Sequence, residues 1–344
     1  AVVQRTFGGI AELVLERRWP VPKVGAHDVL VRVHASGINP LDLRVAEGYA
    51  RSAYEGRLPL VPGRDVAGVV VEAGAAVRGL APGDRVFGAL PPTVRFGAHA
   101  EYVAADHRHL APLPKAAHFL EAAAVSFPAL TAHRALMETG DVRAGERVVV
   151  LGGGGAVGAA AIQLGVARGA EVSVVCGERS VDRALRLGAS AATSTSPDRA
   201  GWSPFDVALD LRGGAESEAA LLRVLKQSGM GRLVTVHGSL VRLADKHGLV
   251  AGAAAAAAQL SLRQAQLWAS HRVRYGWAVM RTDAEALEEV AALLASARLT
   301  IPVSEVLPLE RFAHAYELAN AGRRILLKPT QTHADAGERE GERL

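Results

Sequence analysis

The sequence has little sulfur and few aromatic residues. Cys176 is the single cysteine in 344 residues, methionine occurs three times, and aromatic residues make up 5%. One cysteine excludes a disulfide within the chain and a cysteine-rich zinc lobe. No stretch of eighteen or more apolar residues is free of charge and glycine, so the sequence predicts no membrane-spanning segment.

Charge is also not concentrated in any one run. The formal net charge is +4 and the pI is about 9.4, which suits an anionic cofactor, but no basic run indicates a nucleic-acid patch. With 49% hydrophobic and 22% charged residues the chain is globular, and it is long enough for two domains. The chain starts at Ala1, and the sequence leaves open whether a targeting leader was removed.

The most informative segment is 147–158, where a short aliphatic run ends at four glycines and a small-residue helix follows. The order of strand, glycine turn and helix is typical of a dinucleotide-binding βαβ unit. Residues 153–158 fit the pattern G-x-G-x-x-G, and residues 152–158 fit a close relative of it. Glycines there permit a tight turn and let the backbone approach a pyrophosphate at the helix N-terminus. The segment therefore predicts a nucleotide site formed by Gly152, Gly155, Ala156, Val157 and Gly158.

Element patterns divide the chain into two parts. The first third contains short strand-like runs such as 29–34 with frequent turn signals, which favours a small barrel-like domain. Two alanine-rich helices are then expected, at 120–125 and 130–138, after which strands and helices alternate. That alternation predicts an α/β fold with a doubly wound parallel sheet. The alanine run 253–258 is expected to belong to a helix that continues through Gln266.

Several motifs resemble the medium-chain dehydrogenase/reductase superfamily. They are G-I-N-P-L-D (37–42), L-P-L-V-P-G-R-D-V-A-G-V-V (58–70), P-G-D-R-V-F-G (82–88), A-E-Y-V (100–103) and L-T-A-H (130–133). The resemblance covers roughly residues 1–330. It implies a Rossmann doubly wound parallel sheet inserted into a GroES-like β-rich catalytic domain, with the active cleft between them. The implied division is a GroES-like domain over 1–122, a Rossmann NADP(H)-binding domain over 123–280, a return to the catalytic domain over 281–330 and a mobile tail over 331–344.

This resemblance raises the question of zinc. Alcohol dehydrogenases of the superfamily carry a ligand Cys where this chain has Asn39, and a His where it has Arg64. A catalytic zinc needs three protein ligands of Cys, His or carboxylate type, and the twelve histidines show no paired ligand spacing. We therefore expect no metal. The chain then resembles the zinc-independent quinone oxidoreductase branch, which includes zeta-crystallin and the 2-alkenal reductases. The segments 63–66, 89–92, 175–176 and 274–278 are most similar to a mitochondrial group in that branch, linked to NADPH oxidation and the ubiquinone pathway.

The same resemblance indicates three catalytic residues. It implies that Asn39 and Thr131 lie beside the nicotinamide ribose and ring. Arg44 stands where quinone oxidoreductases often carry a Tyr. Its guanidinium could bind a carboxylate or a quinone oxygen bidentately, or it could be a solvated surface group, and the sequence leaves both interpretations open.

The choice between NADPH and NADH depends on the end of the second Rossmann strand. NAD-specific folds usually have an acidic residue there that bonds the ribose hydroxyls. In this chain the strand ends at Cys176, and Arg179 and Ser180 follow, although Glu178 lies beside them. Arg179 and Ser180 are therefore predicted to bind the 2′-phosphate of NADPH. The other cofactor-binding residues that the resemblance implies are Cys176, Thr195, His237 and Gly238.

Together these observations predict an NADPH-dependent, zinc-independent oxidoreductase that transfers a hydride to a quinone or an activated enone. The alternatives are a 2-alkenal or enoyl-thioester reductase, and a non-catalytic NADPH-binding subunit or sensor of a larger mitochondrial assembly. A homodimer is expected, because sheet-edge pairing is common in such folds. Resemblance alone indicates a mitochondrial location, with plastid or cytoplasm as alternatives. RNA binding, which zeta-crystallin-like proteins can show, has no supporting motif, so no nucleic-acid partner is expected.

Overall fold

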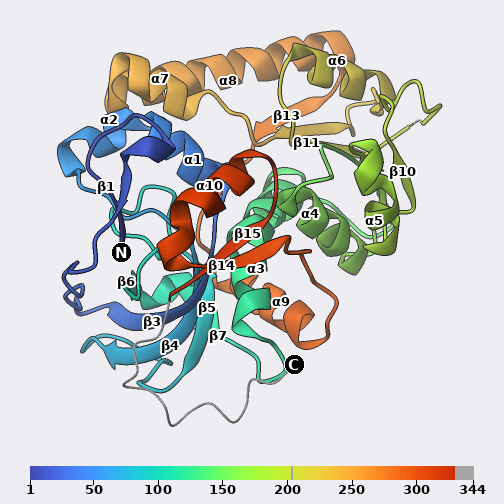
Figure 1. Ribbon diagram of the computed structural model, residues 1–344. Helices are drawn as coiled ribbons and strands as arrows, with labels where there is room; N and C mark the ends of the chain where they lie inside the picture. Colours follow the sequence, from blue (N-terminus) through green and yellow to red (C-terminus); the bar gives the residue numbers. More distant parts are fainter. Residues whose placement is uncertain (203, 330–344) are drawn as a thin grey trace.

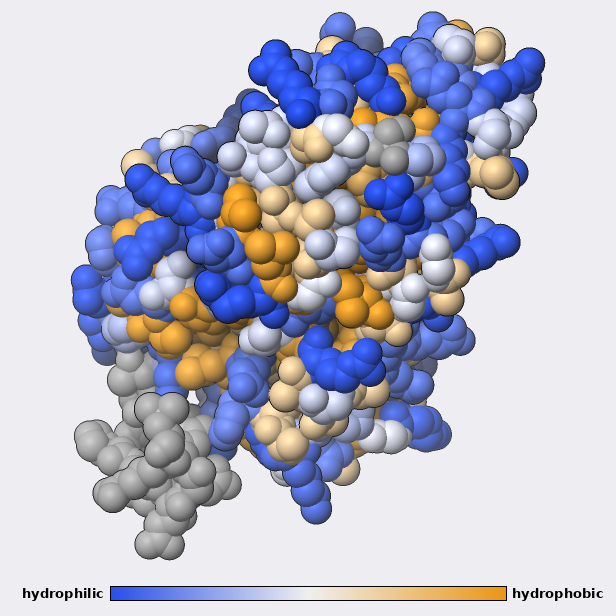
Figure 2. All heavy atoms as spheres, turned by 90° about the vertical axis from the view of Figure 1, so that its right-hand side faces the viewer, coloured by the Kyte–Doolittle hydropathy of each residue, from blue (hydrophilic) through white to orange (hydrophobic). Residues whose placement is uncertain are grey.

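Two large sheets and a helix between them organise the chain (Figure 1). The structure is a computed structural model that describes residues 1–202 and 204–329. The tail predicted to be mobile, 331–344, lies outside the described residues. Figure 2 shows the face on the right-hand side of Figure 1, where hydrophilic residues dominate the outline and hydrophobic ones surface in patches nearer the middle.

The first sheet contains six parallel strands. Their order is β10 (Ala191–Thr193), β9 (Glu171–Val175), β8 (Arg147–Leu151), β11 (Val207–Asp210), β12 (Arg232–Thr235) and β13 (Arg274–Trp277). Numbered along the chain this is 3-2-1-4-5-6, the strand order of a Rossmann sheet. Val148, Val149 and Val150 are fully buried, as the middle strand of a sheet covered on both faces requires. The predicted α/β fold is confirmed.

Helices cover this sheet and extend beyond it. They are α4 (Ala156–Ala167), α5 (Val181–Arg186), α6 (Ala215–Val224), α7 (Leu240–His247) and α8 (Leu249–His271). The alanine run 253–258 lies inside α8, which confirms the helix expected there. In Figure 1, α7 and α8 lie along the top of the molecule, with α7 next to α2 (Arg51–Tyr54). Within the described ranges, no helix is long and apolar enough to cross a membrane.

The second sheet joins the two ends of the chain. Its order is β14 (Glu305–Pro308), β15 (Ile325–Lys328), β3 (Asp28–Gly37), β4 (Asp65–Ala73), β5 (Arg85–Ala89) and β7 (Leu110–Pro112), with β6 (Tyr102–Asp106) also paired to β3. A separate hairpin pairs β1 (Val2–Gln4) with β2 (Leu13–Leu15). The remaining helices are α1 (Pro40–Glu47), α2, α3 (Phe119–His133), α9 (Ala284–Ala295) and α10 (Phe312–Asn320). Short 3-10 turns occur at Ile10–Glu12, Glu55–Arg57, His107–His109, Glu178–Ser180 and Leu309–Arg311.

Helix α3 connects the two sheets. Every residue from 122 to 132 is buried, as expected for a helix that is apolar on all sides. One hydrophobic cluster contains α3 together with Ala67 and Phe87 of the second sheet and Val148 and Val150 of the first. The two sheets therefore share one core, with this alanine-rich helix in the middle.

The sequence predicted two helices here, 120–125 and 130–138, and that prediction is wrong. The helix runs through Pro128 and continues as a π-helical turn, Arg134–Thr139. Pro128 has no N–H to donate to the carbonyl of Ala124 four residues earlier, which normally disrupts a helix. Here Arg324, the residue directly before β15, donates through Nη2 to the carbonyls of Ala124 at 2.7 Å and Ala123 at 3.1 Å. A partner two hundred residues away thus stabilises a helix that its own sequence interrupts.

A second long-range contact connects α7 with α2. The Asp245 carboxylate accepts hydrogen bonds from the backbone N–H groups of Ala50 and Ser52, both at 2.8 Å. Ala50 has a left-handed φ of 64°, which an alanine adopts only where its surroundings impose it. The carboxylate of one half of the molecule therefore caps a short helix of the other.

Removing the carboxylate that pairs with Arg324 should destabilise the protein strongly. Asp65 lies 3.0 Å from Arg324 and is fully buried, so Asp65→Ala leaves an unpaired charge in the core. We expect the free energy of unfolding to fall by about 3–5 kcal/mol in urea denaturation. Arg5→Ala breaks an exposed ion pair with Glu16 and should change the free energy of unfolding by less than about 1 kcal/mol. Equal effects of the two substitutions would contradict this account.

Amide hydrogen exchange should report the capping contact of Asp245. Asp245→Ala removes both acceptors of the α2 N–H groups, so amide hydrogens in segment 50–57 should exchange faster, with a local loss of about 1 kcal/mol. Asp245→Asn keeps one acceptor oxygen, so its exchange rate in this segment should lie between those of the wild type and of the Ala variant. Hydrogen exchange measured by mass spectrometry reports both, and unchanged exchange in the Ala variant would show that the contact is dispensable.

Candidate active site

A cavity of about 320 Å³ lies at the carboxyl ends of β8 and β11. The strand order of the parallel sheet reverses between these two strands, which is where open α/β sheets bind ligands. One wall is the glycine turn with the start of α4, and the other consists of segments 301–304 and 319–324. The lining residues are Ile38, Asn39, Pro40, Pro128, Gly152, Gly154, Gly155, Ala156, Val157, Gly158, Ala159, Arg183, Leu211, Ile301, Pro302, Ser304, Ala319, Gly322, Arg323 and Arg324.

The glycine turn has the geometry that its pattern predicts. Gly152 has a φ of 87°, which favours glycine. A Cβ on Gly158 would lie 2.4 Å from the Cα of Gly153, so only glycine lets α4 pack this closely on the turn. At Gly155, which caps α4, a Cβ would have no neighbour within 4 Å. The N-terminus of α4 therefore faces open space, and its N–H groups and dipole favour an anion there.

Three arginines line this cavity. Arg183 of α5 donates through Nη2 to the carbonyl of Gly154 at 2.6 Å and to Ser180 Oγ at 2.9 Å. Arg323 and Arg324 lie on the opposite wall. Arg323 pairs with Glu305 at 3.7 Å and Arg324 with Asp65 at 3.0 Å, so the helix N-terminus with Arg183 beside it is the part of the lining that suits a pyrophosphate. The sequence did not indicate these arginines. Arg323 and Arg324 lie far from the glycine turn in the sequence, so only the fold brings them to the same cavity.

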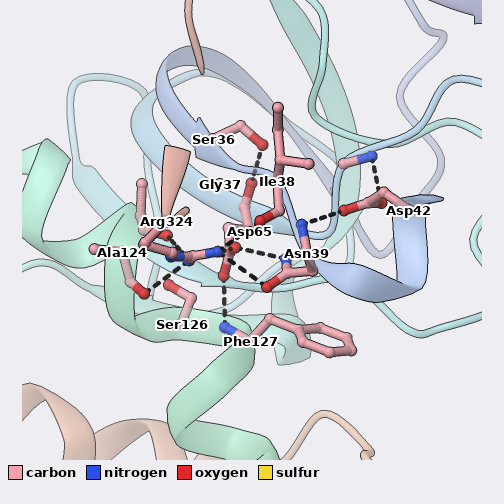
Figure 3. A network of polar contacts seen from close by, with 12 residues as sticks. Ser36, Gly37, Ile38, Asn39, Asp42, Asp65, Ala124, Ser126, Phe127 and Arg324 are labelled. Carbon is pink, nitrogen blue, oxygen red and sulfur yellow. Dashed lines mark hydrogen bonds and ion pairs between the residues drawn. The ribbon is translucent and has the colours of Figure 1, made fainter. Parts of the chain in front are cut away.

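Figure 3 shows the polar network behind the far wall, around Asp65. Asp65 Oδ2 accepts from Arg324 Nη2 at 3.0 Å and from Asn39 Nδ2 at 2.8 Å, and Oδ1 accepts from the N–H of Phe127 at 2.6 Å. Burial raises the pKa of the Asp65 carboxyl, and the Arg324 charge and these hydrogen bonds oppose the rise. The network connects β4, α1, α3 and the residue before β15 at one point.

Asn39 occupies the centre of this network. Its Oδ1 accepts from Arg324 Nη1 at 3.1 Å, and its backbone N–H donates to Asp42 Oδ2 at 2.8 Å, which caps α1. The side chain is buried but lines the cavity beside Pro40, Pro128 and Leu211. Both ends of its amide are therefore engaged, and its main effect is to fix Arg324 and the start of α1.

The other two predicted catalytic residues do not line the cavity. Thr131 is buried, and its Oγ1 donates to the carbonyl of Phe127 at 2.8 Å, inside α3. Arg44 is exposed on α1, one helical turn beyond Pro40. The cavity thus brings together Asn39 and the five residues predicted at the turn, Gly152, Gly155, Ala156, Val157 and Gly158.

The residues predicted around the cofactor's adenosine lie outside the cavity lining. Arg179 and Thr195 are exposed, and Thr195 bonds Thr193 at 3.0 Å. Ser180 is half-buried and accepts from Arg183. Cys176 is buried, and burial raises the pKa of its thiol while Arg183 opposes that rise, so the thiol is neutral near pH 7 and a poor nucleophile.

The two predicted residues after β12 lie near the same edge of the sheet. His237 is exposed, and its Nε2 lies 3.0 Å from the carbonyl of Leu211. A Cβ on Gly238 would meet the indole of Trp277 at 2.8 Å. Close approach of Trp277 therefore requires glycine at this position, which gives Gly238 a packing role.

The residues where the superfamily places a zinc ligand do not fit a zinc ion. Arg64 is 1% exposed, and its Nη1 lies 3.3 Å from Asp42 Oδ1 while its Nη2 donates to Tyr54 at 3.0 Å. A buried guanidinium repels a cation, and Asn39 is committed to Asp65. Within residues 1–202 and 204–329, no group of three or more His, Cys, Asp or Glu could hold a metal ion.

Comparisons with known proteins agree with this fold and site. The alcohol dehydrogenase GroES-like domain family matches residues 25–115, and the zinc-binding dehydrogenase family matches residues 187–325. The chain is 31% identical over 317 residues to the mitochondrial NAD(P)H oxidoreductase RTN4IP1 of Danio rerio, covering 86% of this chain and 81% of the relative. It is 33% identical over 249 residues to the chloroplastic NADPH-dependent alkenal/one oxidoreductase of Arabidopsis thaliana, covering 70% of this chain and 63% of the relative.

A solved structure extends the agreement to three dimensions. The quinone oxidoreductase from Coxiella burnetii superposes with a TM-score of 0.80 at 25% identity, covering 96% of this chain and 99% of the other. The mitochondrial group indicated by the motifs is that of reticulon-4-interacting protein, and the resemblance is confirmed. With both halves matched and a relative above 30% identity over most of its length, the chain belongs to the medium-chain dehydrogenase/reductase family of oxidoreductases.

Proposed function

We propose that the protein is an NADPH-dependent, zinc-independent oxidoreductase that reduces a quinone or an activated enone. The observation that carries the proposal is the cavity at the reversal of strand order, with a glycine turn and a helix N-terminus on one wall and Arg323 and Arg324 on the other. Relatives named as NAD(P)H oxidoreductases, an alkenal/one oxidoreductase and a quinone oxidoreductase support it.

The residues present fit a dinucleotide. The N–H groups at the start of α4, beside Gly155, would bind a pyrophosphate. Arg323 and Arg324 on the cavity lining already pair with Glu305 and Asp65. When bound, NADPH supplies a hydride from its nicotinamide ring. Near Asn39 the lining turns apolar, with Ile38, Pro40, Pro128 and Leu211, and such a surface excludes water from the end of the cavity where hydride transfer would take place.

The acceptor side follows from the chemistry of conjugated carbonyls. A hydride adds to the electron-poor carbon of an enone or to a quinone, and the electron pair moves onto the carbonyl oxygen, which takes a proton from solvent or from a cleft side chain. Binding in a fixed near-attack geometry is the main requirement, since no metal polarises the carbonyl. Asn39 and Pro40, at the start of α1, line the cavity where such an acceptor would bind.

A 2-alkenal or enoyl-thioester reductase is the second candidate. The matches to the Arabidopsis alkenal/one oxidoreductase and to a 2-methylene-furan-3-one reductase of Solanum lycopersicum, at 35% identity over 232 residues, favour enone chemistry. A non-catalytic NADPH-binding subunit remains the alternative from another class. The acceptor experiment below separates the three.

Assembly and location form part of the proposal. A homodimer is the expected state, with membership of a larger mitochondrial assembly as the further possibility. The relatives' names support a mitochondrial location, since RTN4IP1 proteins from several animals are named mitochondrial. The Arabidopsis relative is named chloroplastic, which keeps a plastid as the alternative.

The first test is oxidation of NADPH followed at about 340 nm with a short-chain ubiquinone analogue and a 2-alkenal in parallel. We expect turnover with NADPH above that with NADH, and faster turnover with the quinone. A preference for the alkenal would assign the protein to the enone reductases. NADPH binding without reduction of either acceptor would overturn the enzymatic proposal in favour of a binding subunit.

Asn39→Ala tests the wall that faces the glycine turn. The substitution removes the amide that bonds both Asp65 and Arg324, so the wall loses one of the contacts that fix each of these two side chains. We expect KM for NADPH to rise about tenfold, equivalent to about 1.4 kcal/mol. Ser36→Ala is the matched control, because Ser36 Oγ bonds only the backbone carbonyl of Asp65 at 2.8 Å in the same buried region. An unchanged KM in the Asn39 variant would contradict this role.

A further inference from the structure

Helix α8, along the top of the molecule in Figure 1, is unusually apolar for a helix at a protein surface. Its buried residues are Gly252, Ala256 and Leu267, and it packs against α7 and β13. From residue 249 to residue 270 the charged residue is Arg263 alone, and Arg263 forms an ion pair with Glu218 of α6. The side of α8 that faces away from the protein therefore contributes no charged side chain of its own, although all of α8 lies within the described residues.

Large apolar side chains are exposed along this side. Val250 is 86% exposed, Leu262 60% and Trp268 42%. Met230 is 61% exposed beside Trp268, since a Cβ on the neighbouring Gly229 would lie 3.2 Å from the Trp268 indole. A surface helix normally turns polar residues outward, and a contiguous exposed apolar patch marks an interaction site. We define the α8 face as its exposed residues Val250, Ala254, Ala257, Ala258, Ser261, Leu262, Ala265, Trp268 and Ala269.

Basic residues flank both ends of the α8 face. Arg242 and Lys246 of α7 are exposed just before its first turn, and Arg272 and Arg274 are exposed just after its last turn. Asp245 is the single acidic residue between Arg242 and Arg274, and its carboxylate already caps α2. The complementary partner is therefore apolar opposite the middle of the helix and negatively charged around both ends.

A second copy of this chain fits the α8 face poorly. A contact along the 23 residues of α8 is about 34 Å long and about 10 Å wide, so it covers about 340 Å² on each partner and about 700 Å² in total. A specific interface needs about 1,000 Å² or more. Pairing two α8 helices in either direction also brings their basic ends together, which is unfavourable.

A negatively charged bilayer surface meets both requirements. Apolar side chains of a surface-bound helix enter the boundary between headgroups and acyl chains, while arginine and lysine side chains reach the lipid phosphates. Tryptophan is favoured at headgroup level, where its ring is apolar and its N–H is polar. The alanines between Val250 and Trp268 have short side chains, so the helix can lie flat on such a surface.

We infer that the α8 face docks the protein reversibly on an anionic lipid bilayer, with the helix parallel to the surface. Val250 and Leu262 enter the bilayer boundary, and the basic residues at both ends bind phosphates. Among the described residues, none of α7 or α8 lines the cavity. The inference therefore does not depend on the proposed cofactor or acceptor.

The test is flotation of the full chain with phosphatidylcholine vesicles that contain or lack phosphatidylglycerol. Val250→Glu and Leu262→Glu place a negative charge on the α8 face at exposed positions. Val21→Glu, at a position 56% exposed in the segment before β3, is the matched control. Lys246→Gln and Arg272→Gln each remove one flanking charge. Urea denaturation of each variant verifies that it is folded.

We expect the wild type to bind vesicles that contain phosphatidylglycerol and to be released by salt, because salt screens the attraction. Val250→Glu and Leu262→Glu should each weaken binding about tenfold or more. Lys246→Gln and Arg272→Gln should weaken it about fivefold each, and Val21→Glu should leave it unchanged.

Trp268→Leu should retain binding but lose most of the blue shift of tryptophan emission that vesicles cause in the wild type. Absence of wild-type binding at low salt, or equal weakening by Val21→Glu and Leu262→Glu, would overturn the inference. It would also be overturned by a dimer that Leu262→Glu dissociates, or by binding of this face to an acidic protein without binding to vesicles.

Discussion

The buried pair between Asp65 and Arg324 is the interaction on which the rest of the structure depends. It connects residues 259 positions apart in the chain, and each partner also satisfies groups that would otherwise be buried unbonded. Asp65 accepts the N–H of Phe127, and Arg324 donates to the carbonyls that precede Pro128. Such a pair is favoured in a core when its remaining donors and acceptors are bonded, and here the interrupted helix supplies partners for Asp65 Oδ1 and Arg324 Nη2, while Arg324 Nε is buried without one among the described residues.

Because this pair fixes Arg324, it also shapes the cavity. Arg324 is part of the cavity lining, and its guanidinium is held by Asp65 of β4 and by Asn39 from the side of α1. Arg64 lies one residue before Asp65 and is anchored separately to Asp42 and Tyr54. Two buried arginines on adjacent parts of the catalytic half therefore organise a region that other members of the superfamily use for a metal. Fixed geometry around the cofactor is what a metal-free hydride transfer requires.

Much of the fold could be predicted because its signals are local. The aliphatic run, the glycines and the small residues after them specify strand, turn and helix within twelve residues of sequence, and Gly152 and Gly158 have the backbone reasons expected of glycine there. The continuity of α3 could not be predicted, because the group that replaces the missing N–H of Pro128 comes from the far end of the chain. The contact between Arg183 and the glycine turn could not be predicted for a different reason. Side chains on a helix point toward its N-terminus, so Arg183 of α5 reaches back to Ser180 and to the carbonyl of Gly154.

The pairing of β14 and β15 with β3 also determines when the site can exist during synthesis. The ribosome releases the glycine turn and α4 long before residues 301–304 and 319–324, which make the opposite wall. Until β15 joins β3, Asp65 lacks its guanidinium and α3 lacks the donors that its proline requires. A nascent chain that ends before β15 therefore carries the strands of the Rossmann sheet but only half of the cavity, and β15, the last strand among the described residues, completes the binding site.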